Sequence, residues 1–138
     1  MSDQSLGQMF LDRTKQFPAR SAFRVKRSGA YVDVSYKEAA ERVAAVAAGY
    51  LTVEGGLARR ACVGILGHTS MDWIVCDFAA LCIDCLVAPI YATLLPAEIG
   101  YILQDANVDV IVVENKKGYD RVHDVATKGF TFFDKHYP

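Results

Sequence analysis

The sequence has no excess of charge of either sign, and this argues against one broad class of partner. Its 138 residues include 15 lysines and arginines and 16 aspartates and glutamates, for a formal net charge of −1. Domains that bind nucleic acid usually carry a basic face and a high isoelectric point. We therefore expect no nucleic-acid partner for this chain.

The sequence also lacks the long apolar runs that target or anchor a protein. Met1–Gln4 is polar and acidic, with neither a basic segment nor an apolar stretch behind it, so no signal peptide is predicted. The most apolar windows, Trp73–Ile83 and Leu86–Leu95, are short and are flanked or interrupted by Asp77 and Asp84. Neither window predicts a transmembrane segment, and we expect a cytoplasmic protein.

Familiar catalytic motifs are absent as well. The chain contains no G-x-G-x-x-G, no G-x-x-x-x-G-K-[ST], no G-x-S-x-G and no H-E-x-x-H. Gly64-x-x-Gly67 lies near a predicted strand–helix turn but lacks the spacing of a phosphate-binding loop. A small flavodoxin-like or Rossmann-like ligand binder is therefore disfavoured. Composition and spacing alone predict no catalytic residue.

The four cysteines lie in apolar runs, which favours a reducing compartment over a secreted disulfide scaffold. Cys82 and Cys85 form a C-x-x-C, which can indicate a redox dithiol, half of a zinc site or simple packing. A redox dithiol normally opens a helix, whereas Cys82 falls near the end of a predicted one. There the helix dipole and Asp84 both oppose a thiolate. We expect buried packing positions and no metal ligands.

The first part of the chain predicts two helices separated by a β-hairpin. Ser5 and Gln8 have the spacing of a capping box, and the helix they open is expected to end before Pro18. Two short apolar runs in residues 21–34 flank a Ser-Gly turn and predict the hairpin. Ser35 and Glu38 form a second capping box, followed by an apolar stripe at helical spacing.

Residues 62–114 predict a strand–helix–strand–helix–strand unit. The expected elements are strand Cys62–Leu66, helix Met71–Ile83, strand Leu86–Tyr91, a helix from Pro96, and strand Val108–Glu114. Continuous β-branched runs are typical of parallel strands covered on both faces, and the crossovers are expected to be right-handed. The predicted class is therefore α/β: an N-terminal helix and hairpin, then βαβαβ with parallel strands and flanking helices.

The helix Met71–Ile83 is apolar on nearly every side, which indicates a place inside a core or at an interface. Asp77 is its main polar interruption, and we expect a partner for this carboxylate or a functional role. Beyond the last strand the pattern weakens. A short helix is predicted at Gly118–Ala126, and residues 129–138 are aromatic-rich without a predicted structure.

His68 is the one candidate binding residue. It follows the strand Cys62–Leu66 at the carboxyl end of the predicted parallel sheet, where open α/β proteins place their ligands. It could contact a ligand or act as a local base, or it could be a solvated loop histidine. His123 and His136 have no partners at an informative spacing.

Two stretches resemble a known family. Val34–Leu51, "VSYKEAAERVAAVAAGYL", resembles the first core motif of the adenylate-forming (AMP-binding) enzymes, and Val63–Asn115 resembles their second. "VGILG", "PIYATL" and "YILQDANVDVIVVEN" are most similar to the long-chain fatty acid–CoA ligases. The resemblance extends over residues 6–115. The chain departs from the pattern at Leu57–Arg60, at Thr69 and at Ile83–Cys85.

The resemblance implies a two-step reaction in a longer enzyme. A fatty acid carboxylate would attack ATP to give an acyl-adenylate, and the thiol of CoA would then displace AMP. The residues that the family uses for ATP and Mg²⁺ include a Ser/Thr/Gly-rich loop ending in Pro-Lys, and none can be matched in this sequence.

We therefore expect residues 1–138 to be a single partial domain, the N-terminal part of such a ligase, with 116–138 unassigned. The chain is expected to be inactive alone, with ATP, Mg²⁺ and CoA binding to the full-length parent. That parent is expected in the cytoplasm and peripherally at the membrane, and self-association through uncovered apolar surface is expected of the chain. The alternative is a free-standing, non-catalytic binding or oligomerisation module derived from the same fold.

Overall fold

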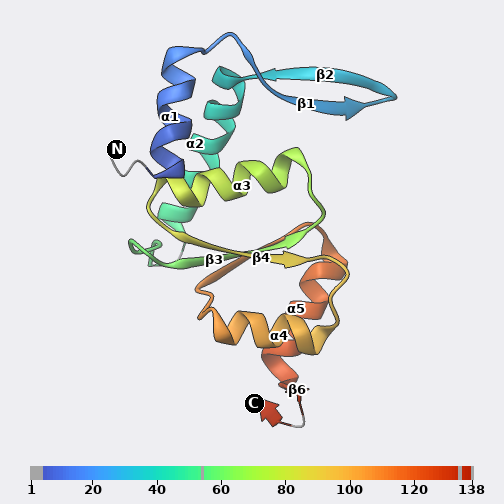
Figure 1. The fold of residues 1–138 in the computed structure, drawn as a ribbon. Coiled ribbons are helices and arrows are strands. Elements are labelled where there is room, and N and C mark those ends of the chain that lie inside the picture. Colours follow the sequence, from blue (N-terminus) through green and yellow to red (C-terminus); the bar gives the residue numbers. More distant parts are fainter. Residues whose placement is uncertain (1–4, 54, 134, 138) are drawn as a thin grey trace.

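The computed structural model of this chain describes residues 5–53, 55–133 and 135–137, which form an α/β fold (Figure 1). The elements in chain order are α1 Leu6–Gln16, β1 Ser21–Arg27, β2 Ala30–Ser35, α2 Tyr36–Thr52, β3 Cys62–Gly67, α3 Met71–Cys82, β4 Leu86–Tyr91, α4 Pro96–Asp105, β5 Val110–Val113, α5 Lys116–Lys128, β6 Phe130–Phe132 and β7 Lys135–Tyr137. The predicted order of helix, hairpin, helix and βαβαβ is confirmed.

The two predicted capping boxes have different outcomes. Ser35 and Glu38 form a complete box, because the Ser35 N–H donates to Glu38 Oε2 at 2.8 Å and the Glu38 N–H donates to Ser35 Oγ at 3.2 Å. Ser5 Oγ also accepts from the Gln8 N–H, at 3.2 Å. The Gln8 side chain, however, donates to Asp12 instead of reaching back to Ser5. The prediction of a full box at Ser5 is therefore wrong in its second half.

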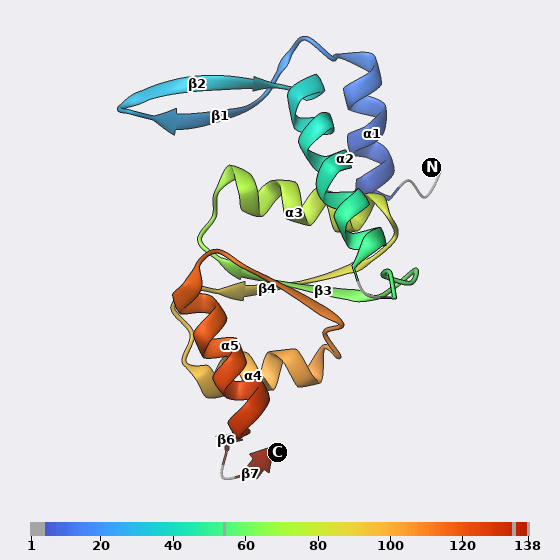
Figure 2. The same ribbon diagram turned by 180° about the vertical axis from the view of Figure 1, so that it is seen from behind.

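Strands β3, β4 and β5 form a parallel sheet in the order β4-β3-β5, with Cys62 beside Leu86 and Val63 beside Val110. Helix α3 covers one face, and α4 and α5 cover the other (Figures 1 and 2). β5 is shorter than predicted at its start. Val108 does not join the strand, because its N–H still donates to Leu103 O at the end of α4.

Helix α3 is covered by its own chain on several sides. One end of α3 packs under α1, where the rings of Phe10 and Phe78 stack with centroids 4.4 Å apart. Helix α2 crosses beside it, and Tyr50 Oη donates to Cys76 O at 3.4 Å. Val75 and Ala79 are buried in the main core. The all-round apolar character of this helix therefore reflects a central position in the fold.

The residues that follow β5 pack against β5 and α4. Helix α5 is longer than the predicted short helix, and Asn115 Oδ1 caps it by accepting from the Gly118 N–H at 3.0 Å. The aromatic tail forms the antiparallel pair β6–β7. Its Phe132 ring stacks on Tyr101 of α4 with centroids 4.7 Å apart. The sequence did not predict this pair, because its strands are only three residues long and their aromatic contacts are non-local.

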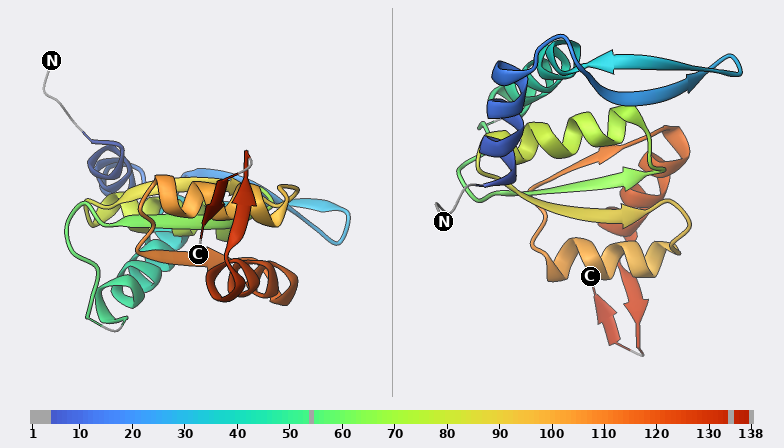
Figure 3. Two further views of the ribbon diagram at one scale, coloured as in Figure 1. Left: turned by 90° about the horizontal axis from the view of Figure 1, so that it is seen from below. Right: turned by 45° about the horizontal axis from the view of Figure 1, so that its top comes forward.

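The hairpin β1–β2 extends away from the rest of the molecule, as two further views show (Figure 3). Its inner face carries Phe23 and Val25, which pack against the main core at the base of the hairpin. Within the described residues, no helix is both long enough and apolar enough to cross a bilayer.

Gly7 allows α1 to approach α3 closely. A Cβ atom at this position would lie 2.4 Å from Leu81 O and 2.7 Å from Leu81 C, both backbone atoms that cannot rotate away. We therefore expect Gly7→Ala to force α1 and α3 apart and to lower the free energy of unfolding by about 1–3 kcal/mol. Urea denaturation measures this difference.

The matched control is Gly49→Ala in α2, where a Cβ would meet nothing within 4 Å. This substitution is expected to raise the free energy of unfolding by about 0.5–1 kcal/mol, because alanine favours a helix more than glycine does. Equal effects at the two positions would contradict the close contact between α1 and α3.

Candidate functional site

His68 lies directly after β3 at the carboxyl end of the parallel sheet, where the sequence placed it. Its Nδ1 is 2.8 Å from Glu114 Oε2, and its backbone N–H donates to the same oxygen at 3.2 Å. Because Glu114 directly follows β5, the pair joins the ends of two adjacent strands. Facing a carboxylate, Nδ1 carries the proton, so the imidazole is held in one tautomer and one orientation.

The His68–Glu114 pair changes the titration of the carboxyl group. The hydrogen bond from the His68 ring, followed by the one from its backbone, lowers the pKa of Glu114 from its ordinary 4.5. The His68 side chain is 71% exposed and the Glu114 side chain 41%, so the pair is open to solvent and to ligands. Sequence reasoning missed Glu114, although its position just after a strand beside β3 was a usable signal.

A cavity of about 250 Å³ opens on one side of this pair. Trp73, Val112 and Val113 are among its apolar lining residues, and Asp72 and Glu114 are its acidic ones. Asp72 forms an ion pair with Arg42 of α2. Its lining residues include no lysine or arginine, so a phosphate or carboxylate ligand would find no strong cationic partner there. Apolar or neutral polar groups suit this cavity better.

A smaller cavity, of about 80 Å³, lies on the other side of the pair and is more basic. Asn115, Lys117 and Arg121 contribute to its lining. Arg121 Nη1 donates to Ala92 O at 3.0 Å and to Leu94 O at 3.1 Å, which ties α5 to the loop after β4. The guanidinium therefore has a structural role in addition to its charge.

The geometry provides an oriented imidazole but no nucleophile beside it. Within the described ranges, no serine, threonine or cysteine side chain is hydrogen-bonded to His68. The nearby Ser70 Oγ caps α3 by accepting from the Trp73 N–H at 3.2 Å. Hydrolysis or acyl transfer through a triad therefore has no support in this arrangement.

Asp77 is half-buried on α3, and its burial raises the pKa of the carboxyl group. The partner that the sequence led us to expect for it is not among the described residues, where no hydrogen bond or ion pair to Asp77 is found. Asp77 also lines neither of the cavities beside His68.

The two cysteines of the C-x-x-C contact different parts of the chain. Cys82 is the last residue of α3, and its Sγ lies 3.7 Å from Gly7 O. Cys85 is buried, with its Sγ 3.7 Å from Ala58 O. Burial raises the pKa of both thiols, and the charge of Asp84 raises that of Cys85 further. In the part of the chain that the structure describes, no three His, Cys, Asp or Glu side chains converge as metal ligands would.

Comparison with known proteins identifies the family. A family model described as "AMP-binding enzyme" matches residues 10–132 of this chain. The chain belongs to the AMP-binding enzyme family.

Curated members of the AMP-binding enzyme family with similar sequences are long-chain-fatty-acid–CoA ligases. The chain is 27% identical over 118 residues to ligase ACSBG2 of Mus musculus. The aligned region covers 86% of this chain but 17% of that protein. It is 30% identical over 115 residues to ligase ACSBG1 of Rattus norvegicus, with 83% of the chain and 16% of that protein covered. The chain thus spans about one sixth of the length of these relatives.

Solved structures show the same fold. A protein of Rhodopseudomonas palustris assigned as a long-chain-fatty-acid CoA ligase superimposes with a TM-score of 0.76 and 24% identity, covering 92% of this chain and 30% of that one. Klebsiella oxytoca NpsA in complex with 3-hydroxyanthranilyl-AMSN superimposes with a TM-score of 0.72 and 20% identity, covering 83% and 22%. The chain therefore has the fold found in part of the N-terminal region of adenylate-forming enzymes.

The His68–Glu114 pair predicts a measurable titration. Carboxyl-carbon NMR should give Glu114 a pKa below 4.5 in the wild-type chain. In His68→Ala the pKa should rise, but stay below 4.5, because the backbone N–H of residue 68 still donates to the carboxylate. His123→Ala, which removes a histidine that makes no contact with Glu114, should leave the pKa unchanged.

The sign of the stability effect follows from this shift. Because the pKa of Glu114 is lowered on folding, the pair stabilises the chain fully above pH 4.5 and loses this contribution as the pH falls through the lowered value. A Glu114 pKa that does not respond to His68→Ala would contradict the pairing.

The C-x-x-C predicts a packing effect without a metal effect. Replacing both cysteines, Cys82→Ala with Cys85→Ala, should lower the free energy of unfolding by about 1–3 kcal/mol through lost contacts. Alkylation of the native thiols at neutral pH should be much slower than in the urea-unfolded chain, because their pKa values are raised. Zinc bound stoichiometrically to the wild-type chain would overturn this interpretation.

Proposed function

We propose that this chain is the N-terminal part of a long-chain fatty acid–CoA ligase. The whole protein would form an acyl-adenylate from a fatty acid and ATP, and then transfer the acyl group to CoA with release of AMP. The observation that carries this proposal is the similarity to long-chain-fatty-acid–CoA ligases over 86% of the chain, within a family match to residues 10–132.

The chain by itself is proposed to be inactive. The resemblance implies that ATP would bind at a Ser/Thr/Gly-rich loop ending in Pro-Lys, and no such stretch occurs in these 138 residues. Neither cavity beside His68 fits Mg²⁺-ATP. The one of about 250 Å³ has no lysine or arginine among its lining residues to hold the phosphates, and the one of about 80 Å³ is too small for a nucleotide. ATP, Mg²⁺ and CoA would therefore bind elsewhere in the full-length protein.

Within that protein the chain would serve as a structural platform located in the cytoplasm and peripherally at a membrane. The carboxyl ends of β3 and β5 would face the remainder of the enzyme, and the apolar cavity beside Trp73 would be closed by it.

The alternative function, a free-standing oligomerisation module, has one observation in its favour. Leu86, Tyr91 and Leu95 leave more than half of their area exposed on the β4 side of the sheet.

Two copies would associate through the apolar side chains of this surface, and not by adding a strand to the open edge of β4. The Leu86 N–H donates to Ala61 O on the β3 side, so the backbone at Pro89, three residues on, faces the open edge of β4. Proline has no N–H to offer there, and an added strand would meet a gap in its hydrogen bonding.

A paired activity assay tests the proposal. The 138-residue chain, supplied with Mg²⁺-ATP and a long-chain fatty acid, should give no ATP–pyrophosphate exchange. The protein translated from the same gene with any coding sequence that follows residue 138 should give both exchange and acyl-CoA. Exchange by the isolated chain would contradict its proposed inactivity.

Sedimentation of the same two proteins distinguishes the proposed ligase from the free-standing oligomerisation module. A gene that stops at residue 138, together with a stable oligomer, would favour the free-standing module. A downstream sequence that contains the Ser/Thr/Gly-rich loop, but supports no acyl-CoA formation from any long-chain acid, would count against the ligase.

A further inference from the structure

The charges of this chain are strongly separated along the sequence, although its net charge is only −1. Residues 12–37 hold seven lysines and arginines and two aspartates, a formal charge of +5. The rest of the chain holds eight basic and fourteen acidic residues, a formal charge of −6. A protein with this distribution has a basic end and an acidic body, which composition alone does not reveal.

The fold keeps the basic residues together at one end of the molecule. They come from the second half of α1, the connection to the hairpin, β1 and the first turn of α2, which lie at the end opposite to α4 and α5 (Figure 1). All seven side chains are exposed: Arg13, Lys15, Arg20, Arg24, Lys26, Arg27 and Lys37. Arg27 alternates to the face of Phe23 and Val25, and the other six together with Tyr31 are called the hairpin surface.

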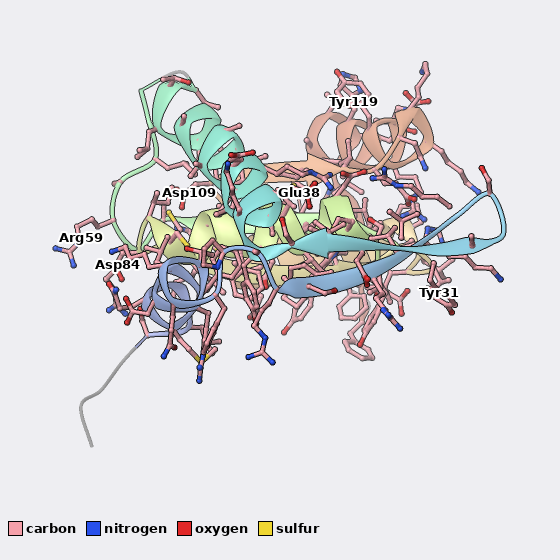
Figure 4. The ribbon with its side chains drawn as sticks, turned by 90° about the horizontal axis from the view of Figure 1, so that it is seen from above. Tyr31, Glu38, Arg59, Asp84, Asp109 and Tyr119 are labelled. Atoms are coloured by element: carbon pink, nitrogen blue, oxygen red, sulfur yellow. The ribbon has the colours of Figure 1, made fainter. Side chains whose placement is uncertain are left out.

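An aromatic side chain projects from the same surface. In the hairpin register Lys26 pairs with Tyr31 and Arg24 with Asp33, so these four side chains share the face opposite to Phe23 and Val25. Tyr31 is 70% exposed, and it lies toward the end of the hairpin remote from α2 (Figure 4). An exposed tyrosine flanked by cations is a combination suited to the interface between lipid headgroups and acyl chains.

We propose that the hairpin surface docks the protein on an anionic phospholipid bilayer, with Tyr31 at the level of the headgroups. The basic side chains would contact lipid phosphates and carboxylates, and the acidic body would be repelled from them, which fixes the orientation. A bilayer is favoured over a single-stranded nucleic acid because proteins that bind single strands stack successive bases on several aromatic side chains, and the hairpin surface exposes one, Tyr31. If the proposed ligase function holds, the bilayer would also supply the enzyme with its long-chain fatty acid, and that step rests on the proposed function. The docking itself does not depend on it.

Vesicle co-sedimentation of the 138-residue chain tests the docking. The chain should bind vesicles of phosphatidylcholine and phosphatidylserine in a roughly three-to-one ratio, and should bind pure phosphatidylcholine vesicles weakly. The double variant Lys26→Gln with Lys37→Gln should lower the partition coefficient about 25-fold, since each cation near the surface contributes about fivefold. Neither ammonium group has a hydrogen-bond or ion-pair partner in the described part of the chain, so the fold should be unaffected.

The matched control is Arg60→Gln with Lys117→Gln, which removes two exposed cations outside the hairpin surface that likewise have no side-chain partner among the described residues. This control should bind the anionic vesicles like the wild-type chain. Equal losses in the two double variants would show a simple dependence on net charge and would overturn the proposal. Equal binding to the anionic and the neutral vesicles would also overturn it.

Tyr31→Ser separates a bilayer from other polyanions. It should weaken binding to anionic vesicles several-fold while leaving the salt dependence of binding unchanged, because the lost contact is apolar. Binding to double-stranded DNA as tight as that to vesicles, with no effect of Tyr31→Ser on either, would reveal a general polyanion surface instead. Vesicle binding by a parent that makes no acyl-CoA would contradict the proposed function and leave the docking intact.

Discussion

Helix α3 has almost no polar side on which to meet water, and the burial of this one helix organises most of the chain. Its twelve residues lie between a helical layer and the parallel sheet. Gly7 lets α1 come into backbone contact with its last turn, Phe10 stacks on Phe78, and Tyr50 of α2 reaches the carbonyl of Cys76. Because the hydrophobic effect scales with the apolar area removed from water, each of these contacts depends on α3 remaining covered.

The sheet beneath α3 turns this packing into a site. Parallel strands bring the residues that follow β3 and β5 to one edge, and there Glu114 accepts two hydrogen bonds from His68. The pair lies between an apolar cavity, which Asp72 also lines, and a smaller cavity lined by Lys117 and Arg121. The two cavities therefore differ in electrostatic character although both are lined by the His68–Glu114 pair. This edge can orient or seal neighbouring groups, but among the described residues no serine, threonine or cysteine is hydrogen-bonded to His68.

The opposite end of the molecule has a different character, since it carries exposed cations and little of the core. The hairpin packs on the main core through Phe23, Val25 and Val34, and its outer face is free of the constraints that fix the centre of the fold. A family member that spans about one sixth of its relatives would then have two outward-facing regions: a sheet edge that meets the rest of a ligase and a basic end that meets a membrane.

The sequence by itself determined the α/β class, the element order and the family, because these depend on local periodicity, capping residues and extended motifs. The capping pair Ser35–Glu38, the continuous apolar strands and the proline that begins α4 all act within a few residues of themselves. The C-x-x-C could likewise be assigned to a helix end from its place in the pattern. In this sense the sequence also located His68 at the carboxyl end of the sheet.

Only the tertiary structure decided what each of these residues meets. Glu114 became a partner of His68 because β5 pairs beside β3, 46 residues away in the chain. Gly7 mattered only once α1 crossed α3, and the short strands β6 and β7 depend on rings stacked against α4 and against each other. Even the full capping box expected at Ser5 failed because Gln8 found Asp12 instead. Non-local contacts depend on the packing of whole elements, and local sequence patterns carry no direct record of that packing.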